Sequence, residues 1–574
     1  MGFYLGFKMT PPCFQPDLSV YNLISKLSKG STRMETTHPS VPSERDSEGR
    51  GGDARYKWKV MAAVIFGTFM AILDSTAVNV AVPTLQKAFQ AQVDQVDAVL
   101  TAYILALGIV TPLAGWLSER FGIKRIFLLA MGMFVAGSAL CALSPSLPWL
   151  VAFRALQGLG GGLLSPLGLA LLSSAFSEKE RGLAFGLYGI PLVVAPASGP
   201  VLGGYFVQYL SWHYIFLINL PIGIIGIIVG ALWLREERRG ATARLDIPGV
   251  LLSVLAFGCL LFGIQNGQTD GWNSAQILIL LIVGGVALVA FIVVELLVSE
   301  PLLDLRLFLK RMFASASVLG WVSAIALFGA EFLLPIYLQT LRGQTPLQAG
   351  LLVLPLAIAA GLTTPIAGAL YNRVGARWLI AFGSLLLAIN TWQLSTITLN
   401  TDYLIIMEIV AIRGIALGCV LQTTLTAALF GLHPRQVPRA TSLLNASRNI
   451  FQSLGIAVLG TIVTSQFTAY QNDAVNSIHD PHSSLGQQFI HQMQSLLQHG
   501  VPAPAASKAA LGQILGEIFN PNGLIFRTHL LQGINDAYLV TFWLSIATML
   551  LAFTLPSRAG RQQGQIPTGD SALS

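Results

Sequence analysis

Long apolar runs recur along this chain and constrain its fold more than any other feature. They repeat between residues 59 and 556, and each is roughly 18–25 residues long, enough for a helix to cross about 30 Å of hydrocarbon. Lipid offers the backbone no hydrogen-bond partner, so segments within a bilayer must be helical. Only 11% of the 574 residues are charged, against about 25% in soluble domains, which excludes an ordinary soluble enzyme.

The runs predict an all-helical integral membrane protein with fourteen spans. The predicted spans are 59–81, 96–117, 126–143, 148–172, 185–207, 213–234, 247–267, 276–298, 313–338, 347–371, 377–396, 402–430, 442–465 and 537–556. An even number places both termini on one side of the membrane. The predicted inner loops hold 16 lysines and arginines and the short outer loops hold two, so both termini are expected in the cytoplasm. This asymmetry accounts for the net charge of +7 without nucleic acid as a partner.

Sequence repeats divide the spans into two similar halves. GWLSERFGIKRIF (115–127) resembles GALYNRVGARWLI (368–380), and AFRALQGLG (152–160) resembles AIRGIALG (411–418). We therefore expect an N-terminal six-helix bundle at 58–240, two inserted helices at 241–299 and a C-terminal six-helix bundle at 300–558. Polar tails are expected at 1–57 and 559–574. Two repeated bundles that rock about a central site are an architecture of secondary transporters.

A long outer loop, residues 466–536, interrupts the second half and raises the question of a metal. It holds five of the eight histidines, His479, His482, His491, His499 and His529. Their spacing matches no zinc pattern, and QQFIHQMQSLLQHG (487–500) is more typical of an amphipathic surface helix, so we expect no metal. No phosphate-binding Walker loop occurs, so we expect no nucleotide cofactor. No metal or nucleophile set clusters within the spans, so we expect no catalytic residues.

Seven motifs in one order carry a family resemblance. They are LDSTAVNVAVP (73–83), GWLSERFGIKR (115–125), FRALQGLGGG (153–162), SGPVLGG (198–204), WHYIFLINLPIG (212–223), PLLDLRLF (301–308) and LLPIYLQTLRGQTPLQAG (333–350). Together they resemble the fourteen-span drug:proton antiporters of the major facilitator superfamily over about residues 56–558. The resemblance implies a major facilitator fold in a bacterial cytoplasmic membrane and proton-coupled export of lipophilic, often cationic drugs.

The implied partners are a small lipophilic or cationic substrate, protons and membrane lipid, and a periplasmic adaptor is left open. Two other functions also stay open. One is the export of a single endogenous metabolite, such as an amino acid, a siderophore or a lipid. The other is a transporter-like receptor.

Three ionisable residues within apolar spans are the candidates for proton coupling. Asp74 matches the first-span acid that is implicated in proton coupling in the family, and Arg154 matches the fourth-span arginine. A carboxylate in hydrocarbon costs several kcal/mol, so we expect Asp74 to exchange protons in competition with the drug. A guanidinium keeps its charge, so Arg154 would bias a nearby carboxylate. Purely structural roles stay open for both. Glu331, 257 positions after Asp74, is either a second proton or cation site or an interhelical hydrogen-bond partner.

A charged loop matches the segment that acts in the family as a cytoplasmic latch between the halves. Its matching residues are Gly115, Glu119, Arg120, Gly122, Lys124 and Arg125. The family usually has aspartate where this chain has Glu119, which keeps the charge and adds a methylene. An ordinary positive inner loop is the alternative.

Two further sets lie within the predicted spans. Gly199, Pro200, Gly203 and Gly204 match the antiporter signature of span 5, which the family associates with exporters, although Ala195 stands where a glycine is usual. Proline removes a helix hydrogen bond and glycine permits close helix contact. Asn445, Arg448, Asn449 and Gln452 follow helical i, i+3, i+4 and i+7 spacing. We expect this polar stripe to face the cavity or its cytoplasmic mouth, because lipid would penalise it.

Overall fold

The computed structural model describes residues 54–177, 180–236, 246–267, 270–433, 436–499, 501–520 and 523–555. Most of the predicted N-terminal tail and the whole C-terminal tail lie outside the described residues. So do five of the predicted inner-loop cations, Lys179, Arg238, Arg239, Arg244 and Arg435.

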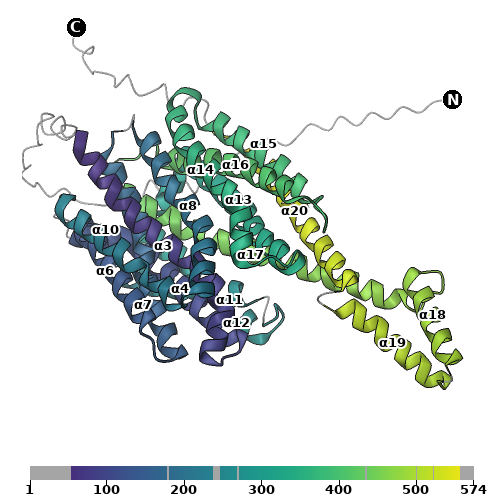
Figure 1. Ribbon diagram of the computed structural model, residues 1–574. Coiled ribbons are helices and arrows are strands. Elements are labelled where there is room, and N and C mark those ends of the chain that lie inside the picture. Colours follow the sequence, from purple (N-terminus) through teal and green to yellow (C-terminus); the bar gives the residue numbers. More distant parts are fainter. Residues whose placement is uncertain are drawn as a thin grey trace, which may run out of the picture. The chain divides into compact units, whose positions relative to one another are not determined.

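Every regular element among the described residues is a helix (Figure 1). The first half contains α3 (Ala54–Phe89), α4 (Val93–Val110), η2 (Thr111–Leu113), α5 (Ala114–Phe121), α6 (Ile123–Ala142), α7 (Leu147–Ala175), α8 (Arg181–Tyr209), α9 (His213–Leu217) and α10 (Asn219–Trp233). The inserted pair is α11 (Ile247–Asn266) and α12 (Ala275–Leu297). The second half contains η3 (Leu305–Leu309), α13 (Arg311–Ile336), η4 (Tyr337–Leu341), α14 (Pro346–Val374), α15 (Ala376–Leu394), α16 (Tyr403–Leu429), α17 (Val437–Ser477), α18 (Ser484–Gln498), α19 (Ala503–Phe519) and α20 (Leu524–Ala552).

The helix positions agree with the predicted spans, and the all-helical membrane fold is confirmed. Thirteen helical stretches of the described residues are long and apolar enough to cross a membrane. The predicted span 377–396 forms α15, which is not among those thirteen; its last turns carry the polar residues Asn390, Thr391 and Gln393. The number of fourteen spans and the cytoplasmic position of both termini therefore stay predictions. α3 begins at Ala54, so residues 54–57 are helical and lead directly into the first predicted span.

Local sequence signals set several of the helix ends. Thr345 caps α14 in a reciprocal capping box with Gln348, and Ser274 accepts a hydrogen bond from the backbone of α12. Gly122 joins α5 to α6 with φ of 93°, and Gly375 joins α14 to α15 with φ of 87°. Both are left-handed conformations that favour glycine. These equivalent turns support the repeat inferred from the sequence.

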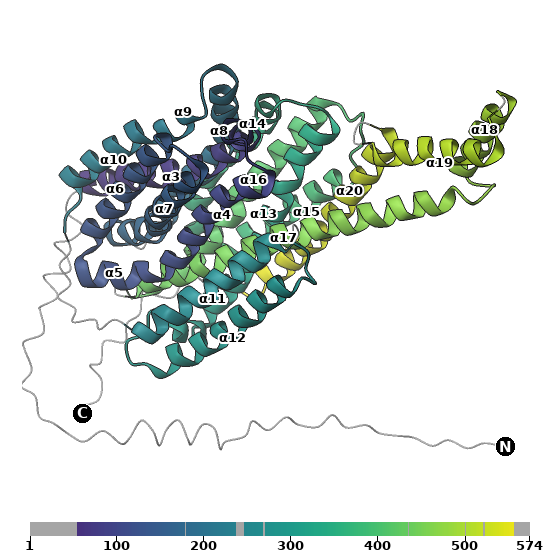
Figure 2. The same cartoon turned by 90° about the horizontal axis from the view of Figure 1, so that it is seen from below.

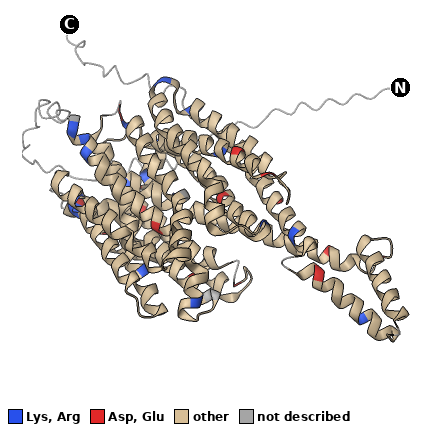
Figure 3. Ribbon diagram, in the orientation of Figure 1, with Lys and Arg blue, Asp and Glu red and all other residues tan. Residues whose placement is uncertain are grey.

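The two halves meet mainly where α8 packs along α14, and α17 also contacts α5 and α7. In the first half, α3 packs against α7, α8 and α10, and its core includes the fully buried Met70, Phe127 and Phe134. The inserted helices α11 and α12 form a hairpin that contacts α4 and α17 (Figure 2). Figure 3 shows how few charged residues the helices carry between their ends.

The predicted outer loop is largely helical. α17 continues to Ser477, α20 begins at Leu524, and α18 and α19 lie between them, away from the other helices (Figures 1 and 2). The stretch at 487–500 forms most of α18, as its amphipathic pattern predicted. Within the described residues, no three histidine, cysteine, aspartate or glutamate side chains are grouped as a metal site would require.

Candidate functional site

An ion pair between α3 and α7 forms the centre of the candidate site. The Nη1 atom of Arg154 donates to Oδ2 of Asp74 at 2.5 Å. The exposed fraction is 0% for Asp74 and 1% for Arg154, so the pair is closed to solvent. The structure thus brings two of the three predicted proton-coupling residues into direct contact, across 80 positions of sequence.

Neutral polar side chains complete the surroundings of the Asp74 carboxylate. The amide of Gln157 donates to Oδ1 at 2.9 Å, and the amide of Asn219 donates to the same atom at 2.7 Å. Gln157 also accepts from Arg154 at 2.7 Å and donates to Ser138 at 2.6 Å. Both carboxylate oxygens therefore have protein partners, which is what a buried charge requires.

The aromatic residue Tyr103 covers the other side of the ion pair. Its ring lies 4.2 Å from the guanidinium carbon of Arg154, a cation–π distance, and its hydroxyl donates to the carbonyl of Ala71 at 3.2 Å. Among the described residues, the groups that form hydrogen bonds or ring contacts with the pair all belong to the first half. Asp74 therefore faces neither lipid nor the space between the halves in this structure, and a drug cannot compete for it directly here.

Sequence reasoning missed Gln157 and Asn219. The sequence did contain evidence for both residues, because each falls within a family motif. Gln157 also follows Arg154 by three positions, which places the two on one helix face. No spacing rule could have placed Asn219 beside Asp74, because α10 and α3 are 145 positions apart at this contact.

The equivalent site in the second half is not an ion pair. Arg413, 2% exposed, donates to the backbone carbonyl of Leu327 at 2.9 Å. Glu331 lies near enough to Arg413 for their charges to interact. The structure describes no hydrogen bond from Glu331, so the predicted interhelical hydrogen bond has no support within the described residues.

The signature of span 5 faces two helices at once. A Cβ atom added to Gly203 would lie 2.8 Å from the carbonyl oxygen of Ala77 in α3, and one on Gly199 would lie 3.0 Å from the Ala77 nitrogen. A Cβ atom on Gly204 would lie 3.2 Å from the backbone of Leu347 in α14. Pro200 lies within α8, and a Cβ atom added to Gly350 of α14 would lie 3.3 Å from its Cβ. α8 therefore packs against both the helix of Asp74 and the second half.

The predicted latch contains a cross-half ion pair, but not between the residues of the loop itself. Arg439 of α17 donates to Glu119 of α5 through Nε at 3.0 Å and Nη2 at 2.7 Å, a bidentate contact. Gly115 lies against the backbone of Arg439, where a Cβ atom would lie 3.2 Å from its Cα.

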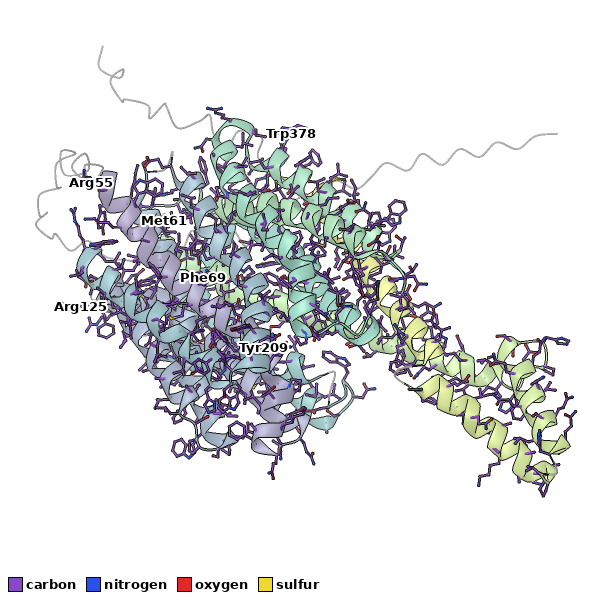
Figure 4. The ribbon with its side chains drawn as sticks, in the orientation of Figure 1. Arg55, Met61, Phe69, Arg125, Tyr209 and Trp378 are labelled. Atoms are coloured by element: carbon purple, nitrogen blue, oxygen red, sulfur yellow. The ribbon has the colours of Figure 1, made fainter. Side chains whose placement is uncertain are left out.

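The cations of the predicted latch loop do not take part in this cross-half contact. Lys124 donates to the carbonyl of Ala231 at 2.8 Å, Arg125 pairs with Glu236 at 3.5 Å, and Arg120 is exposed. These contacts are within the first half. Figure 4 shows Arg55, at the start of α3, and Arg125 toward one end of the first-half helices, and Tyr209 toward the other end.

The polar stripe of α17 lies at the contact between the halves. Asn445, 5% exposed, accepts from Ser165 of α7 at 3.1 Å, and Ser165 is also 3.1 Å from the hydroxyl of Tyr188. Arg448 is close enough to Tyr188 for an electrostatic interaction, and its buried Nε atom has no hydrogen-bond partner. Asn449 and Gln452 are partly exposed on the same helix.

Comparison with known proteins agrees with this geometry. The family model described as Major Facilitator Superfamily matches residues 64–456. The chain is 32% identical over 496 residues to multidrug export protein EmrB of Escherichia coli (strain K12), covering 86% of this chain and 93% of that protein. It is 31% identical over 427 residues to lincomycin resistance protein LmrB of Listeria innocua serovar 6a, covering 74% and 91%. The crystal structure of the human organic anion transporter MFSD10 shares its fold, with a TM-score of 0.52, 14% identity and coverage of 85% of this chain and 99% of that one.

Proposed function

Because the chain belongs to the major facilitator superfamily, we propose that it exports small lipophilic compounds, often cationic, in exchange for protons across a bacterial cytoplasmic membrane. The chain is a multi-pass membrane transporter. Relatives named for multidrug export and lincomycin resistance support drugs as the substrate class. The observation that carries the proposal is the Asp74–Arg154 ion pair, buried between helices that lie in hydrocarbon. Burying two charges costs desolvation free energy that a simple apolar helix contact avoids.

Proton binding to Asp74 would change this site without a drug entering it. A protonated Asp74 is neutral and places a hydrogen on one oxygen, whereas the Arg154 guanidinium stays charged. The 2.5 Å contact between Arg154 and Oδ2 then cannot persist unchanged. Because the carboxylate is fully buried here, proton exchange requires a second state in which the surrounding helices separate.

α8 supplies a route from the ion pair to the interface between the halves. Ala77 lies three positions after Asp74 and contacts Gly199 and Gly203 of α8. The next residue, Gly204, contacts α14 of the second half. We expect a displacement of α3 at Asp74 to shift α8 against α14, because Gly203 lies directly against the backbone of Ala77 and Gly204 lies against the backbone of Leu347. This indirect coupling replaces direct competition at Asp74.

The substrate is expected to bind between the halves, beside the polar stripe of α17. Asn445 and Arg448 face Ser165 and Tyr188 there. The unpartnered Nε of Arg448 can donate to an oxygen or nitrogen acceptor of a drug. Its positive charge repels a cation, so the cationic group of a drug should bind away from it. Apolar pockets discriminate weakly between similar groups, which agrees with a broad range of substrates.

Alternating access would open and close the latch as the bundles 58–240 and 300–558 rock. In this proposal the bidentate Glu119–Arg439 contact would hold one end closed. The free energy available for transport depends on the net charge that crosses the membrane in each cycle. A membrane potential supplies about 2.3 kcal/mol per charge per 100 mV, and a pH gradient about 1.36 kcal/mol per unit. One proton exchanged for one monovalent cation uses only the pH gradient, and a second proton at Glu331 would restore the contribution of the potential.

The test is drug-driven proton movement in proteoliposomes that contain the purified protein. A panel of lipophilic cations and of amino acids, siderophores and lipids separates a drug exporter from a metabolite exporter. Asp74→Asn should abolish coupled proton movement. Asp402→Asn makes the same chemical change at an exposed helix cap outside the site, and asparagine also caps helices, so it should leave transport intact. Full coupling in Asp74→Asn would refute the role of the ion pair.

A further inference from the structure

A second pair of acidic residues lies in the inserted helices, apart from the site described above. Asp246 caps the N-terminus of α11, and Glu295 lies in the last turn of α12. The two helices form an antiparallel hairpin, so these ends are adjacent. The exposed fraction is 7% for Asp246 and 0% for Glu295.

Each of the two carboxyl groups has one oxygen bonded and one without a partner. Oδ1 of Asp246 accepts from the backbone of Gly249 at 3.0 Å, and Oε2 of Glu295 accepts from the backbone of Leu303 at 3.1 Å. Oδ2 of Asp246 and Oε1 of Glu295 are buried and have no hydrogen-bond partner.

The two unpartnered oxygens face the same space over Gly249. A Cβ atom added to this glycine would lie 2.3 Å from Oδ2 of Asp246 and 2.9 Å from Oε1 of Glu295. A side chain at this position would occupy the space that both oxygens face. Two ionised carboxylates so placed repel each other without water to screen them.

Few charged residues act on this pair within the part of the chain that the structure describes, which excludes residues 237–245 just before Asp246. Arg439 of α17 is the cation whose charge acts on Glu295, and Asp246 is the acid that does so. From the segment after α12, Arg306 donates to the carbonyls of Leu296 and Val298 rather than to a carboxylate. Arg439 is already bound to Glu119. One arginine is thus shared between the latch and this acidic pair.

We propose that Asp246 and Glu295 form a proton-binding site in which the two carboxyl groups share one proton while the Glu119–Arg439 contact is closed. A single proton satisfies both unpartnered oxygens, since one carries it and the other accepts its hydrogen bond. Ca²⁺ takes six to eight oxygen ligands and Mg²⁺ keeps several waters, and two buried carboxylate oxygens alone complete neither set of ligands. Loss of the proton adds a negative charge near Arg439 and competes with Glu119 for it.

Infrared spectroscopy of the full-length protein in lipid nanodiscs tests the shared proton, because a protonated carboxyl group has its own C=O stretching band. Glu295→Gln mimics the protonated group and should fold; it should remove one such band at neutral pH. Asp246→Asn keeps the helix cap and should shift or remove the same band. Asp402→Asn should leave it unchanged. A band unaffected by Glu295→Gln, or one whose frequency does not change in Asp246→Asn, would overturn the proposal.

The link to the latch has a separate readout. Spin labels attached through an unnatural amino acid at the exposed Phe121 and Val374 report the distance between the ends of α5 and α14. In the wild-type protein this distance should increase at alkaline pH, and Glu295→Gln should keep it short. The same pH response in Glu295→Gln and in the wild type would overturn the link. Neither measurement uses a drug or Asp74, so failure of the proposed transport function would not affect them.

Discussion

Replacing Asp74 by asparagine isolates the contribution of one buried charge. The asparagine keeps the size of the side chain and an oxygen to which Gln157 and Asn219 can still donate, but the counter-charge of Arg154 is lost. Since Arg154 is 1% exposed, its guanidinium would remain as an uncompensated charge in the interior. Breaking a buried pair from one side costs about 3–5 kcal/mol. We expect Asp74→Asn to lower the free energy of unfolding by this amount.

Replacing the other member of the pair, Arg154→Gln, should lower the free energy of unfolding by a smaller amount. Two neutral donors still stabilise the Asp74 carboxylate in that variant. The double variant removes both charges and leaves two amides that can hydrogen-bond to each other. It should therefore be at least about 2 kcal/mol more stable than the sum of the two single losses implies. That difference is the coupling energy of the pair.

The chain offers a matched control, since Lys57 and Glu180 form an ion pair at the same distance of 2.5 Å. Their side chains are 21% and 41% exposed, so a second double-mutant cycle should give a coupling of less than about 1 kcal/mol. Both cycles can be measured by denaturant titration of the purified protein in bicelles. If the coupling at Asp74 does not exceed that at Glu180, burial does not strengthen the pair and the reasoning is wrong.

Three further predictions concern the latch, the helix interface and pH. Glu119→Gln should weaken the cross-half contact by about 1 kcal/mol, seen as greater modification of engineered cysteines at that end of the bundle. Gly368→Ala should lower the melting temperature and transport, because its Cβ would lie 2.2 Å from a backbone carbonyl of α8, whereas Gly132→Ala has open space and should stabilise α6 by about 0.5–1 kcal/mol. The hydrogen bond from Lys57 lowers the pKa of Glu180 below its ordinary value of 4.5. Its small stabilisation is therefore present above pH 4.5 and lost as pH falls through the lowered pKa, and melting curves of Glu180→Gln against pH should show that loss.

The helices could be predicted from the sequence because backbone groups within lipid must form their hydrogen bonds inside a helix. Long apolar runs mark the segments to which this requirement applies. The sequence also predicted the two-fold repeat, and Gly122 and Gly375 show why a repeat is visible in the sequence. Both occupy turns with positive φ, where other residues are strained, so the same residue recurs in both halves. Residues 466–536 lack long apolar runs, and the sequence therefore gave little indication of helices that continue beyond the spans.

The contacts of the candidate site could be predicted only in part. Asp74 and Arg154 each stand out as charges in apolar spans, yet their contact depends on the packing of α3 against α7, which no spacing within one helix reports. The latch shows the same limit. The sequence grouped Glu119 with the cations of its own loop, whereas its partner is Arg439, 320 positions away. Helix ends from the two halves converge there, and local sequence does not encode that convergence.

The position of α8 explains how a buried ion pair and a distant interface can depend on each other. Three prolines, Pro191, Pro196 and Pro200, interrupt its backbone hydrogen bonds, so this helix bends more readily than its neighbours. Its glycines put its backbone directly against α3 on one side and α14 on the other. A helix that can bend and that lies in close contact with both neighbours can pass a small displacement from one to the other. Closely packed helix interfaces switch between discrete arrangements rather than deform gradually, so a small shift on one side can change the packing on the other. If Asp74 takes up a proton, the resulting rearrangement at Arg154 has a physical path to the second half, even though Asp74 is buried away from any drug in this structure.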